Sequence, residues 1–251
     1  MLCGSRRFTG APYLAAMGAL RSGAGLVYSA VPESIYEITA SRLVEPIVIP
    51  MPDSQGKFSY NGWNEIAKML SNMDVVLIGC GMGVSADTSA LTKMVLENYN
   101  GTVILDADGI NAIYEHKDSL RGRNGQTILT PHFGEFCRFA GEVPESSCDA
   151  AMKLAKKYQA VILLKGNRTL ITDGEVCYRN ETGNPGMAVG GSGDLLSGII
   201  ASLVGQKMSP LEAAAVGAWL HGKAGDICAE EIGEYGMLPS DMLNVLPRLL
   251  K

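Results

Sequence analysis

The chain has 251 residues, of which 47% are hydrophobic and 19% are charged, and its formal net charge at pH 7 is −5. This length suffices for a large buried core, and we expect residues 1–251 to form a single catalytic domain. The acidic balance offers no basic surface for nucleic acid, and no apolar run approaches the roughly 20 residues that cross a bilayer. We therefore predict a cytoplasmic protein with neither a nucleic-acid nor a membrane partner.

Near its start the chain contains a stretch that resembles an export signal. In SRRFTGAPYLAAMGAL two arginines precede an apolar run, but Gly10 and Pro12 interrupt this run and Arg21 follows it. The spacing favours an amphipathic helix over residues 11–22 instead. The expected apolar face of this helix is Leu14, Met17, Leu20 and Ala24.

Apolar, β-branched segments alternate with helix-like segments along the rest of the chain. The predicted strands are 25–31, 44–49, 75–78, 103–105, 127–129, 161–165, 169–172 and 176–179. The predicted helices are 11–22, 64–70, 88–98, 146–158, 194–204, 210–232 and 240–250. This alternation implies parallel β-α-β units, and the DGE turn predicts one antiparallel hairpin. The expected fold is a three-layer α/β/α arrangement with a mainly parallel central sheet and a small antiparallel edge hairpin.

Six cysteines are dispersed along the chain without a C-x-x-C pair. Their spacing favours small buried side chains in a reducing compartment over a disulfide framework or a zinc site. With only three histidines and no H-E-x-x-H pattern, no metal-ligating residue is predicted. The cysteines are Cys3, Cys80, Cys137, Cys148, Cys177 and Cys228.

The stretch VVLIGCGMGVSADT contains the first glycine-rich loop, and LDADGIN with Asp106 follows it. This order resembles a dinucleotide-binding fingerprint, but Val84 stands where the third glycine of G-x-G-x-x-G belongs. A turn that lets the backbone approach a ligand is therefore favoured, and a Rossmann-type oxidoreductase remains the alternative.

Two further loops follow predicted strands and carry polar side chains. In ILTPHFGEF, His132 stands at the end of a strand with Glu135 three residues later, and a structural role and a ligand contact are equally compatible with it. In VILLKGNRTLITDG, Lys165 and Arg168 lie at the carboxyl edge of the sheet, where cations suit a phosphate. An ordinary exposed hairpin turn is the alternative for this second loop.

The stretch NPGMAVGGSGDLLSGII joins a glycine cluster to an apolar helix. Gly191, Ser192 and Gly193 leave little side-chain bulk, so that successive N–H groups can surround an anion. Asp194 is expected at or near the N-cap of the helix, where it would repel that anion unless it removes a proton from an attacking hydroxyl. Phosphoryl transfer is the favoured interpretation, and a simple helix cap is the alternative.

At this motif the chain resembles the ribokinase-like superfamily, and within it the ADP-dependent NAD(P)H-hydrate dehydratase family. The matching pieces, in family order, are GAPYLAAMGALRSGAGLV, IGCGMG, LDADGIN, LTPHFGEF, LLKGNRTLITDG and NPGMAVGGSGDLLSGIIASL. They span nearly the whole chain, and the resemblance implies a ribokinase-like fold.

The resemblance implies a cofactor-repair enzyme that phosphorylates the ring hydroxyl of hydrated NADH or NADPH with ADP, or with ATP in eukaryotic relatives, after which phosphate leaves. Asp194 would take the hydroxyl proton, and Gly191, Ser192 and Gly193 would hold the transferred phosphoryl group. The implied nucleotide-binding residues are Lys165, Gly166, Asn167, Arg168, Thr169 and Gly193. The implied substrate-binding residues are Ala11, Gly83, His132 and Asp194.

The resemblance also implies Mg²⁺ as a cofactor, a homo-oligomer of the tetrameric kind, and a separate hydrate epimerase as functional partner. The chain departs from the family pattern in three places. Only three residues precede Gly4 where a further strand is usual, Phe133 replaces a proline, and Gly109 replaces an alanine. The alternatives are a small-molecule kinase of the hydroxyethylthiazole-kinase type and a nucleotide-binding protein without catalytic activity.

Overall fold

The structure, a computed structural model, describes residues 1–250 and contains ten short strands and ten α-helices within that range. The strands are β1 (Tyr28–Pro32), β2 (Ile47–Met51), β3 (Asp53–Ser54), β4 (Lys57–Phe58), β5 (Val75–Ile78), β6 (Thr102–Leu105), β7 (Thr127–Leu129), β8 (Val161–Leu164), β9 (Leu170–Thr172) and β10 (Cys177–Arg179). The helices are α1 (Ala11–Arg21), α2 (Tyr36–Ala40), α3 (Trp63–Leu70), α4 (Ala86–Asn98), α5 (Asp108–Ala112), α6 (Phe133–Ala140), α7 (Ser147–Tyr158), α8 (Ser192–Gly205), α9 (Pro210–Glu231) and α10 (Pro239–Leu249).

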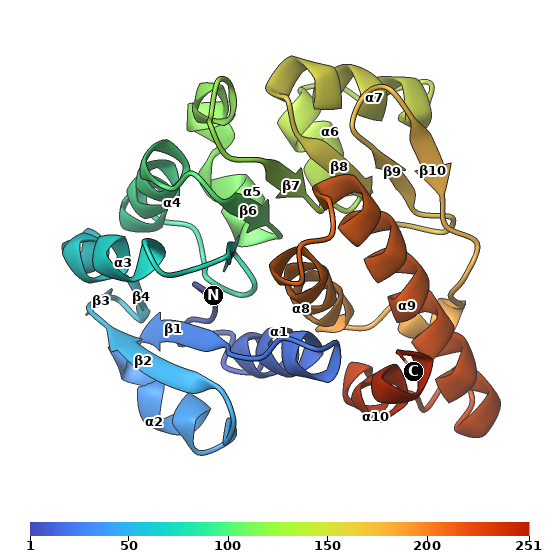
Figure 1. The fold of residues 1–251 in the computed structure, drawn as a ribbon, viewed down its shortest axis with the longest axis horizontal. Coiled ribbons are helices and arrows are strands. Elements are labelled where there is room, and N and C mark those ends of the chain that lie inside the picture. The colour runs from blue at the N-terminus through green and yellow to red at the C-terminus, as the bar shows by residue number, and fades with distance from the viewer. Residues whose placement is uncertain (251) are drawn as a thin grey trace.

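The central sheet has six strands in the order β10-β9-β8-β7-β6-β5 (Figure 1). Strands β5 to β8 pair in parallel, whereas β8, β9 and β10 pair antiparallel. A two-stranded parallel sheet of β1 and β2 is joined to this sheet through Leu2, which pairs with Ala30 of β1 and with Ile78 of β5. The predicted mainly parallel sheet with an antiparallel edge hairpin is confirmed.

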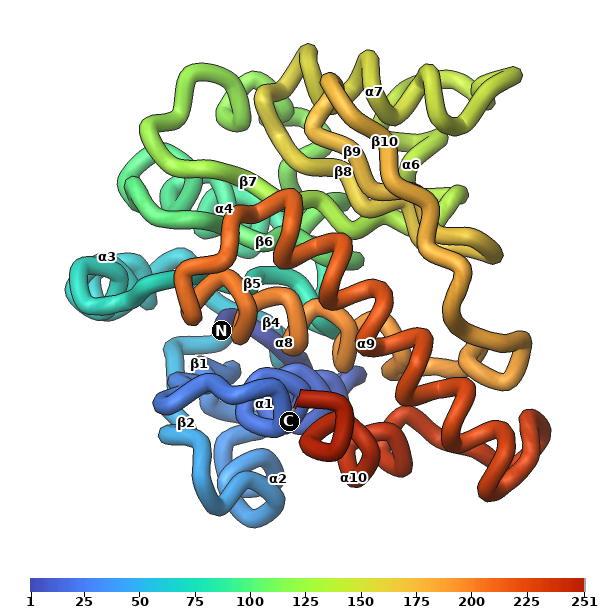
Figure 2. Tube along the Cα trace, turned by 45° about the vertical axis from the view of Figure 1, so that its right-hand side comes forward, coloured from blue at the N-terminus to red at the C-terminus, as the bar shows by residue number. Residues whose placement is uncertain are grey.

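Side chains that alternate along the strands pack into two cores on opposite faces of the sheet. Val76 and Ile78 of β5 belong to the core covered by α3 to α7, and Leu77 between them belongs to the core covered by α1, α8, α9 and α10. This alternation is what a strand with a residue period of two produces when both faces are buried. Figure 2 shows α9 crossing one face of the sheet, and the layers are those of the predicted α/β/α arrangement.

Helices α1 and α8 lie against each other, and small residues let their backbones approach closely. A Cβ atom at Gly18 would lie 2.7 Å from the carbonyl oxygen of Leu195, and one at Gly198 would overlap the carbonyl oxygen of Ala15. The predicted apolar face of Leu14, Met17, Leu20 and Ala24 is half-buried and packs against the cores, whereas smaller residues make the closest contacts. The residues of α1 that the structure buries are Ala11, Pro12, Ala15, Ala16, Gly18 and Ala19.

Most predicted elements begin and end within three residues of the observed ones, and the differences have local causes. The expected strands 25–31 and 44–49 begin three residues later in the structure, because Leu26 and Val44 are exposed. Helices α2, α5 and α6 and the β3–β4 hairpin were absent from the predicted elements. Each has at most eight residues and so offers few repeats of a hydrophobic period, although α3, which is equally short, was predicted as 64–70.

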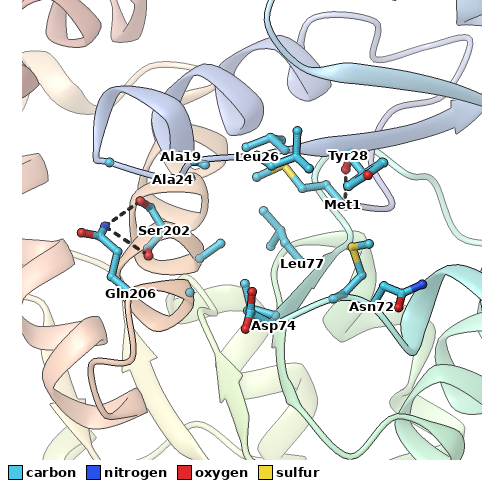
Figure 3. Close-up of a pocket in the computed structure, with 17 residues that line it drawn as sticks. Met1, Ala19, Ala24, Leu26, Tyr28, Asn72, Asp74, Leu77, Ser202 and Gln206 are labelled. Carbon is cyan, nitrogen blue, oxygen red and sulfur yellow. Dashed lines mark hydrogen bonds between the residues drawn. The ribbon is translucent and has the colours of Figure 1, made fainter.

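A cavity of about 350 Å³ lies between β1 and β5, next to the first residue of the chain (Figure 3). The amino group of Met1 is buried there and donates a hydrogen bond of 2.6 Å to the carbonyl oxygen of Tyr28. Asp74 and Val75 line the cavity at the amino end of β5. Within the described residues, no helix is both long enough and apolar enough to span a membrane.

Candidate active site

Polar side chains meet at the carboxyl ends of the parallel strands, which share one edge of the sheet. Cys80 follows β5, Asp106 follows β6 and Lys165 follows β8. The first turn of α8 lies against them, because a Cβ atom at Gly193 would be 3.1 Å from Nζ of Lys165 and 3.6 Å from Oδ2 of Asp106. In a sheet of this kind, ligands bind at this edge.

The glycine cluster starts α8 by a left-handed turn. Gly191 is the N-cap with φ of 94°, a conformation that favours glycine, and Leu14 of α1 packs where its Cβ atom would be. The helix begins at Ser192, so Asp194 is its third residue and its side chain does not cap it. Asp194 therefore lies near the N-cap, as expected, but the alternative in which it only caps the helix is excluded.

The first turn of α8 presents N–H groups that have no acceptor within the helix. Ser192 N–H donates to the carbonyl oxygen of Val189 at 3.3 Å, whereas Gly193 N–H belongs to the part of the turn that lies over Lys165. The helix dipole adds a partial positive charge at this end. This turn combines backbone donors, a positive helix end and an ammonium group around one small volume, as an anion site requires.

Asp194 lies within this volume, and its carboxyl group is unusually basic. Burial, followed by the charge of Asp106, raises its pKa to about 7, although contact with Cys80 and the charge of Lys165 oppose the shift. One carboxylate oxygen each of Asp194 and Asp106 and the sulfur of Cys80 lie within 4.8 Å of one another. A carboxyl group with a pKa near 7 suits proton transfer at neutral pH, because it can hold and release a proton there.

Lys165 and Asp106 form a buried ion pair. Nζ of Lys165 lies 2.6 Å from Oδ1 of Asp106, which also accepts a hydrogen bond of 2.7 Å from the hydroxyl group of Thr130. Burial alone would lower the pKa of Lys165, but the carboxylate of Asp106 outweighs it, so that the pKa is raised and the ammonium form persists. The pair fixes a positive charge beside Gly193.

The hydroxyl group of Ser192 has a partner on a different helix. Its Oγ lies 3.2 Å from Nε2 of His221 on α9. Burial lowers the pKa of His221 to about 4, so the ring is neutral at pH 7. A neutral imidazole holds the hydroxyl group of Ser192 in place without adding charge to the anion site.

His132 caps a helix in the structure. Its Nδ1 accepts hydrogen bonds from the N–H groups of Gly134 at 3.0 Å and Glu135 at 3.3 Å, and the carboxylate of Glu135 accepts from the N–H of His132 at 2.9 Å. This reciprocal arrangement is a capping box for α6. The side chain is 56% exposed, and its Nε2 lies 3.5 Å from Oε1 of Glu135.

The first glycine-rich loop packs tightly between two other segments. A Cβ atom at Gly79 would overlap the backbone of Asp106, and one at Gly81 would lie 2.9 Å from Cβ of Ala11. Gly83, with φ of 73°, donates its N–H to the carboxylate of Asp108 at 2.8 Å. The glycines therefore serve close packing, and the loop places Gly81, two residues before the predicted substrate residue Gly83, against Ala11.

The turn after β8 is exposed and folds on itself. Thr169 donates its hydroxyl group to the carbonyl oxygen of Gly166 at 3.1 Å, and Arg168 adopts φ of 58°. Gly166, Asn167 and Arg168 are exposed to solvent. Of the five predicted nucleotide residues in this turn, Lys165 lies against Gly193 in the first turn of α8.

A resident metal ion does not fit the groups at this site. Among the described residues, the one group of three metal-type side chains comprises Cys80, Asp106 and Asp194. Mg²⁺ prefers six oxygen ligands, whereas this group contains a thiol, and one oxygen of Asp106 already binds Lys165. The pKa of Cys80 is raised well above its usual value by a hydrogen bond with Cys3 and by burial, so the thiol stays protonated.

The sequence interpretation missed three contributors to this site. In the sequence, Asp106 stands out only as part of an incomplete dinucleotide-binding fingerprint, whereas in the structure it binds Lys165 and lies beside Asp194. Thr130 and His221 gave no signal, because a threonine at a strand end and a single histidine in an alanine-rich helix are ordinary. Their roles follow from the pairing of β6 with β7 and from the packing of α9 on α8, which no local pattern encodes.

The parallel sheet, the glycine turn and the carboxylate in the first turn of α8 define a ribokinase-like protein. A family model described as NAD(P)H-hydrate dehydratase matches residues 1–248. The chain belongs to the NAD(P)H-hydrate dehydratase family, as the sequence motifs predict.

Two relatives and one solved structure illustrate the match. The chain is 42% identical, over 99% of its length, to the bifunctional NAD(P)H-hydrate repair enzyme Nnr of Moorella thermoacetica, of which it covers 48%. It is 35% identical to the ADP-dependent (S)-NAD(P)H-hydrate dehydratase of Cenarchaeum symbiosum, with 99% of this chain and 86% of that protein covered. The ADP/ATP-dependent NAD(P)H-hydrate dehydratase from Bacillus subtilis, co-crystallized with ATP/Mg²⁺, has a TM-score of 0.82 at 30% identity and covers 99% of this chain and 86% of that one. The chain thus spans about half the length of the bifunctional relatives.

Proposed function

We propose that this chain catalyses the ADP-dependent dehydration of hydrated NADH or NADPH, and that residues 1–251 act as one catalytic domain. The terminal phosphoryl group of ADP passes to the ring hydroxyl of the hydrate and leaves AMP. The C–O bond then breaks, phosphate departs, and a neighbouring ring carbon loses a proton, which restores the double bond. The observation that carries the proposal is Asp194, a carboxyl group with a pKa of about 7 inside an anion-binding helix turn.

Asp194 is proposed as the base for the first step. Its ionised carboxylate accepts the proton of the ring hydroxyl while that oxygen attacks phosphorus. The pKa of about 7 leaves roughly half of the free enzyme in the required form at neutral pH. The carboxylate repels the phosphates around it, but it faces the hydroxyl group, so base and anion site act on different atoms.

The first turn of α8 and Lys165 are proposed to hold the phosphoryl group during transfer. Gly191, Ser192 and Gly193 contribute backbone N–H groups, and the ammonium group of Lys165 lies against Gly193. In phosphoryl transfer the protein mainly positions the reactants and stabilises negative charge. The Ser192 N–H first has to leave the carbonyl oxygen of Val189, which a bound phosphoryl group would favour.

The remaining predicted residues are assigned to the two substrates. We propose that Gly166, Asn167, Arg168 and Thr169 contact ADP, since their turn is exposed directly after Lys165. Ala11, Gly83 and His132 are proposed to line the hydrate. Mg²⁺, when bound with the nucleotide, would neutralise phosphate charge.

Several predictions about the setting of the reaction remain proposals. The relative from Moorella thermoacetica is named bifunctional and is about twice as long as this chain, which leaves room in it for a second activity. We propose that a separate hydrate epimerase is the functional partner of this chain. A homo-oligomer and a cytoplasmic location are proposed on the family resemblance alone.

The direct test is recovery of the reduced cofactor. Purified protein is incubated with hydrated NADH or NADPH, Mg²⁺ and either ADP or ATP, and the absorbance of the reduced nicotinamide is followed together with AMP and phosphate. We expect recovery of absorbance, with one phosphate released per cofactor restored. A stable phosphorylated product without recovery of absorbance would instead indicate a small-molecule kinase. If the enzyme shows no turnover with ADP and none with ATP, the proposal is rejected.

The variant Asp194→Asn tests the proposed base. We expect kcat to fall by about a thousandfold or more while ADP binding changes little, because the amide cannot accept the hydroxyl proton. The matched control is Asp118→Asn, which alters an exposed carboxylate 91% open to solvent and should leave kcat unchanged. Substantial turnover by Asp194→Asn would mean that another group is the base.

A further inference from the structure

Two cysteines that take no part in the proposed reaction touch each other at the edge of the molecule. Cys148 is the second residue of α7, and Cys177 is the first residue of the edge strand β10. Their sulfur atoms are 2.9 Å apart. Both side chains are half-buried at the border of the core under α7, and both are reduced. Figure 1 shows α7 and β10 side by side at one end of the sheet.

We propose that Cys148 and Cys177 form a reversible disulfide, which is a redox-controlled covalent link between α7 and β10. Thiols in contact can be joined with little displacement of the backbone, whereas thiols on diverging segments cannot. The half-buried positions admit a small oxidant. Cys3 and Cys80, whose thiols also interact, are fully buried and serve as the internal contrast.

Contacts that already hold α7 against the hairpin make this link compatible with the reduced fold. Lys156 of α7 lies 3.1 Å from the carboxylate of Glu175 in the hairpin turn. Gly174 of the same turn packs against Lys156 so closely that a Cβ atom would lie 2.5 Å from its Cγ. The contact between Cys148 and Cys177 joins the same helix to the same hairpin, so a disulfide reinforces an existing interface.

The link would close a loop that contains part of the proposed nucleotide site. The chain from Cys148 to Cys177 includes β8, the turn 165–169 and β9. A disulfide lowers the conformational entropy of the unfolded chain by an amount that grows with the logarithm of the number of residues in the loop it closes. It also limits opening of the folded segment. Oxidation is therefore expected to stabilise the edge hairpin and the exposed turn that it supports.

The exchange reaction is balanced with a glutathione disulfide as oxidant. One cysteine thiolate attacks a glutathione sulfur and releases one glutathione thiolate. The second cysteine thiolate attacks the protein sulfur of this mixed disulfide and releases the other glutathione. Two protein thiols are oxidised and one glutathione disulfide is reduced to two thiols.

The environment of the thiols sets the pH at which the link forms. Burial and then the contact with Cys148 raise the pKa of Cys177 to about 11, which Arg179 lowers and Asp149 raises in smaller measure. The thiolate of Cys177 is therefore scarce at neutral pH. Because exchange requires a thiolate, the disulfide should form faster as the pH is raised.

The test maps the bond in the full chain. Reduced protein is incubated at pH 8.5 with oxidised glutathione, digested with trypsin without reduction, and analysed by mass spectrometry. We expect peptide 139–153 joined to peptide 169–179, lighter by two hydrogens than the sum of the two thiol peptides. Both cysteines carrying glutathione without a link between them, or unmodified thiols, would overturn the proposal.

A second readout measures the effect of the link. The melting temperature of the oxidised protein should exceed that of the reduced protein by about 5 °C or more. Cys148→Ser and Cys177→Ser should each abolish this difference, whereas Cys137→Ser, a half-buried cysteine of α6, should retain it. A difference that persists in Cys148→Ser would assign the stabilisation to another pair and reject the proposal.

Discussion

The carboxyl group of Asp194 is buried and has both a negatively and a positively charged neighbour. Together, burial and these two charges set its pKa and therefore the pH range in which it can act as a base. The charge of Asp106 adds to the effect of burial, and Lys165 opposes it. Since Lys165 and Asp106 neutralise each other across 2.6 Å, burial dominates the shift. The same geometry that keeps a positive charge beside Gly193 thus leaves Asp194 basic.

The pH dependence of activity and of stability should both report this carboxyl group. With a folded-state pKa of about 7, kcat/KM should rise tenfold per pH unit below pH 7 and level off above it. The unfolded value is lower, near 3.8, so the protonated form stabilises the folded state at acid pH and this contribution is lost as the pH rises through 7. Asp194→Asn should therefore raise the melting temperature by a few degrees at pH 8 and by less at pH 5. An equal shift at both pH values would contradict the raised pKa.

At the residue scale, the sequence indicated the groups whose chemistry is local and missed those whose role depends on folding. Asp194 and Lys165 stand beside glycines at predicted strand or helix ends, which marks them as functional. Asp106 and His221 carry no such mark, because each becomes relevant only through a partner more than 25 residues away in the chain. The predicted helix start at residue 194 is two residues late, because Gly191 starts the helix earlier than the apolar run suggests.

Helices α1 and α8 position the anion site through their close contact. The first turn of α8 is held against α1 by Leu14 over Gly191 and by the backbone contact between Gly198 and Ala15. Small residues on both helices make this approach feasible. Hydrophobic periodicity could not predict this close contact between the two helices. A hydrophobic period is read from large apolar side chains, and the large apolar side chains of α1 lie partly outside the contact.

The variant Gly198→Ala tests the close packing of these helices. The added methyl group would overlap the carbonyl oxygen of Ala15, so the helices must separate, at a cost of about 2–4 kcal/mol. We expect the melting temperature to fall by roughly 5–12 °C, measured by circular dichroism. Gly205→Ala is the control on the same helix, because its nearest neighbour would be Val75 at 3.8 Å. Equal melting temperatures for both variants would show that the helices are not in backbone contact.

In the whole molecule, residues near the start of the chain join two sheets that would otherwise be separate. Leu2 donates its N–H to Leu77 at 2.8 Å and accepts from Gly79 at 3.1 Å, while Ala30 donates to the carbonyl oxygen of Met1 at 2.9 Å. The sequence predicted the α/β/α layers from alternating segments, but not this junction, since a single paired residue has no periodicity.

The variant Leu2→Pro tests the junction. Proline has no N–H, so the hydrogen bond from residue 2 to the carbonyl oxygen of Leu77 is lost. We therefore expect faster hydrogen exchange of the Ala30 and Gly79 amides and a lower melting temperature. Amides of β6 and β7 should stay protected, because their pairing does not involve Leu2. Leu2→Ala keeps the N–H and should preserve protection at Ala30. Unchanged exchange in Leu2→Pro would mean that the two sheets are held together by side chains alone.

The buried amino group of Met1 has a practical consequence for handling the protein. The cavity between β1 and β5, which Tyr28 and Leu77 line, lies next to this amino group. An affinity tag or fluorescent label attached there would compete with the contacts that join the two sheets. Attachment after α10, at the other end of the chain, leaves that junction untouched.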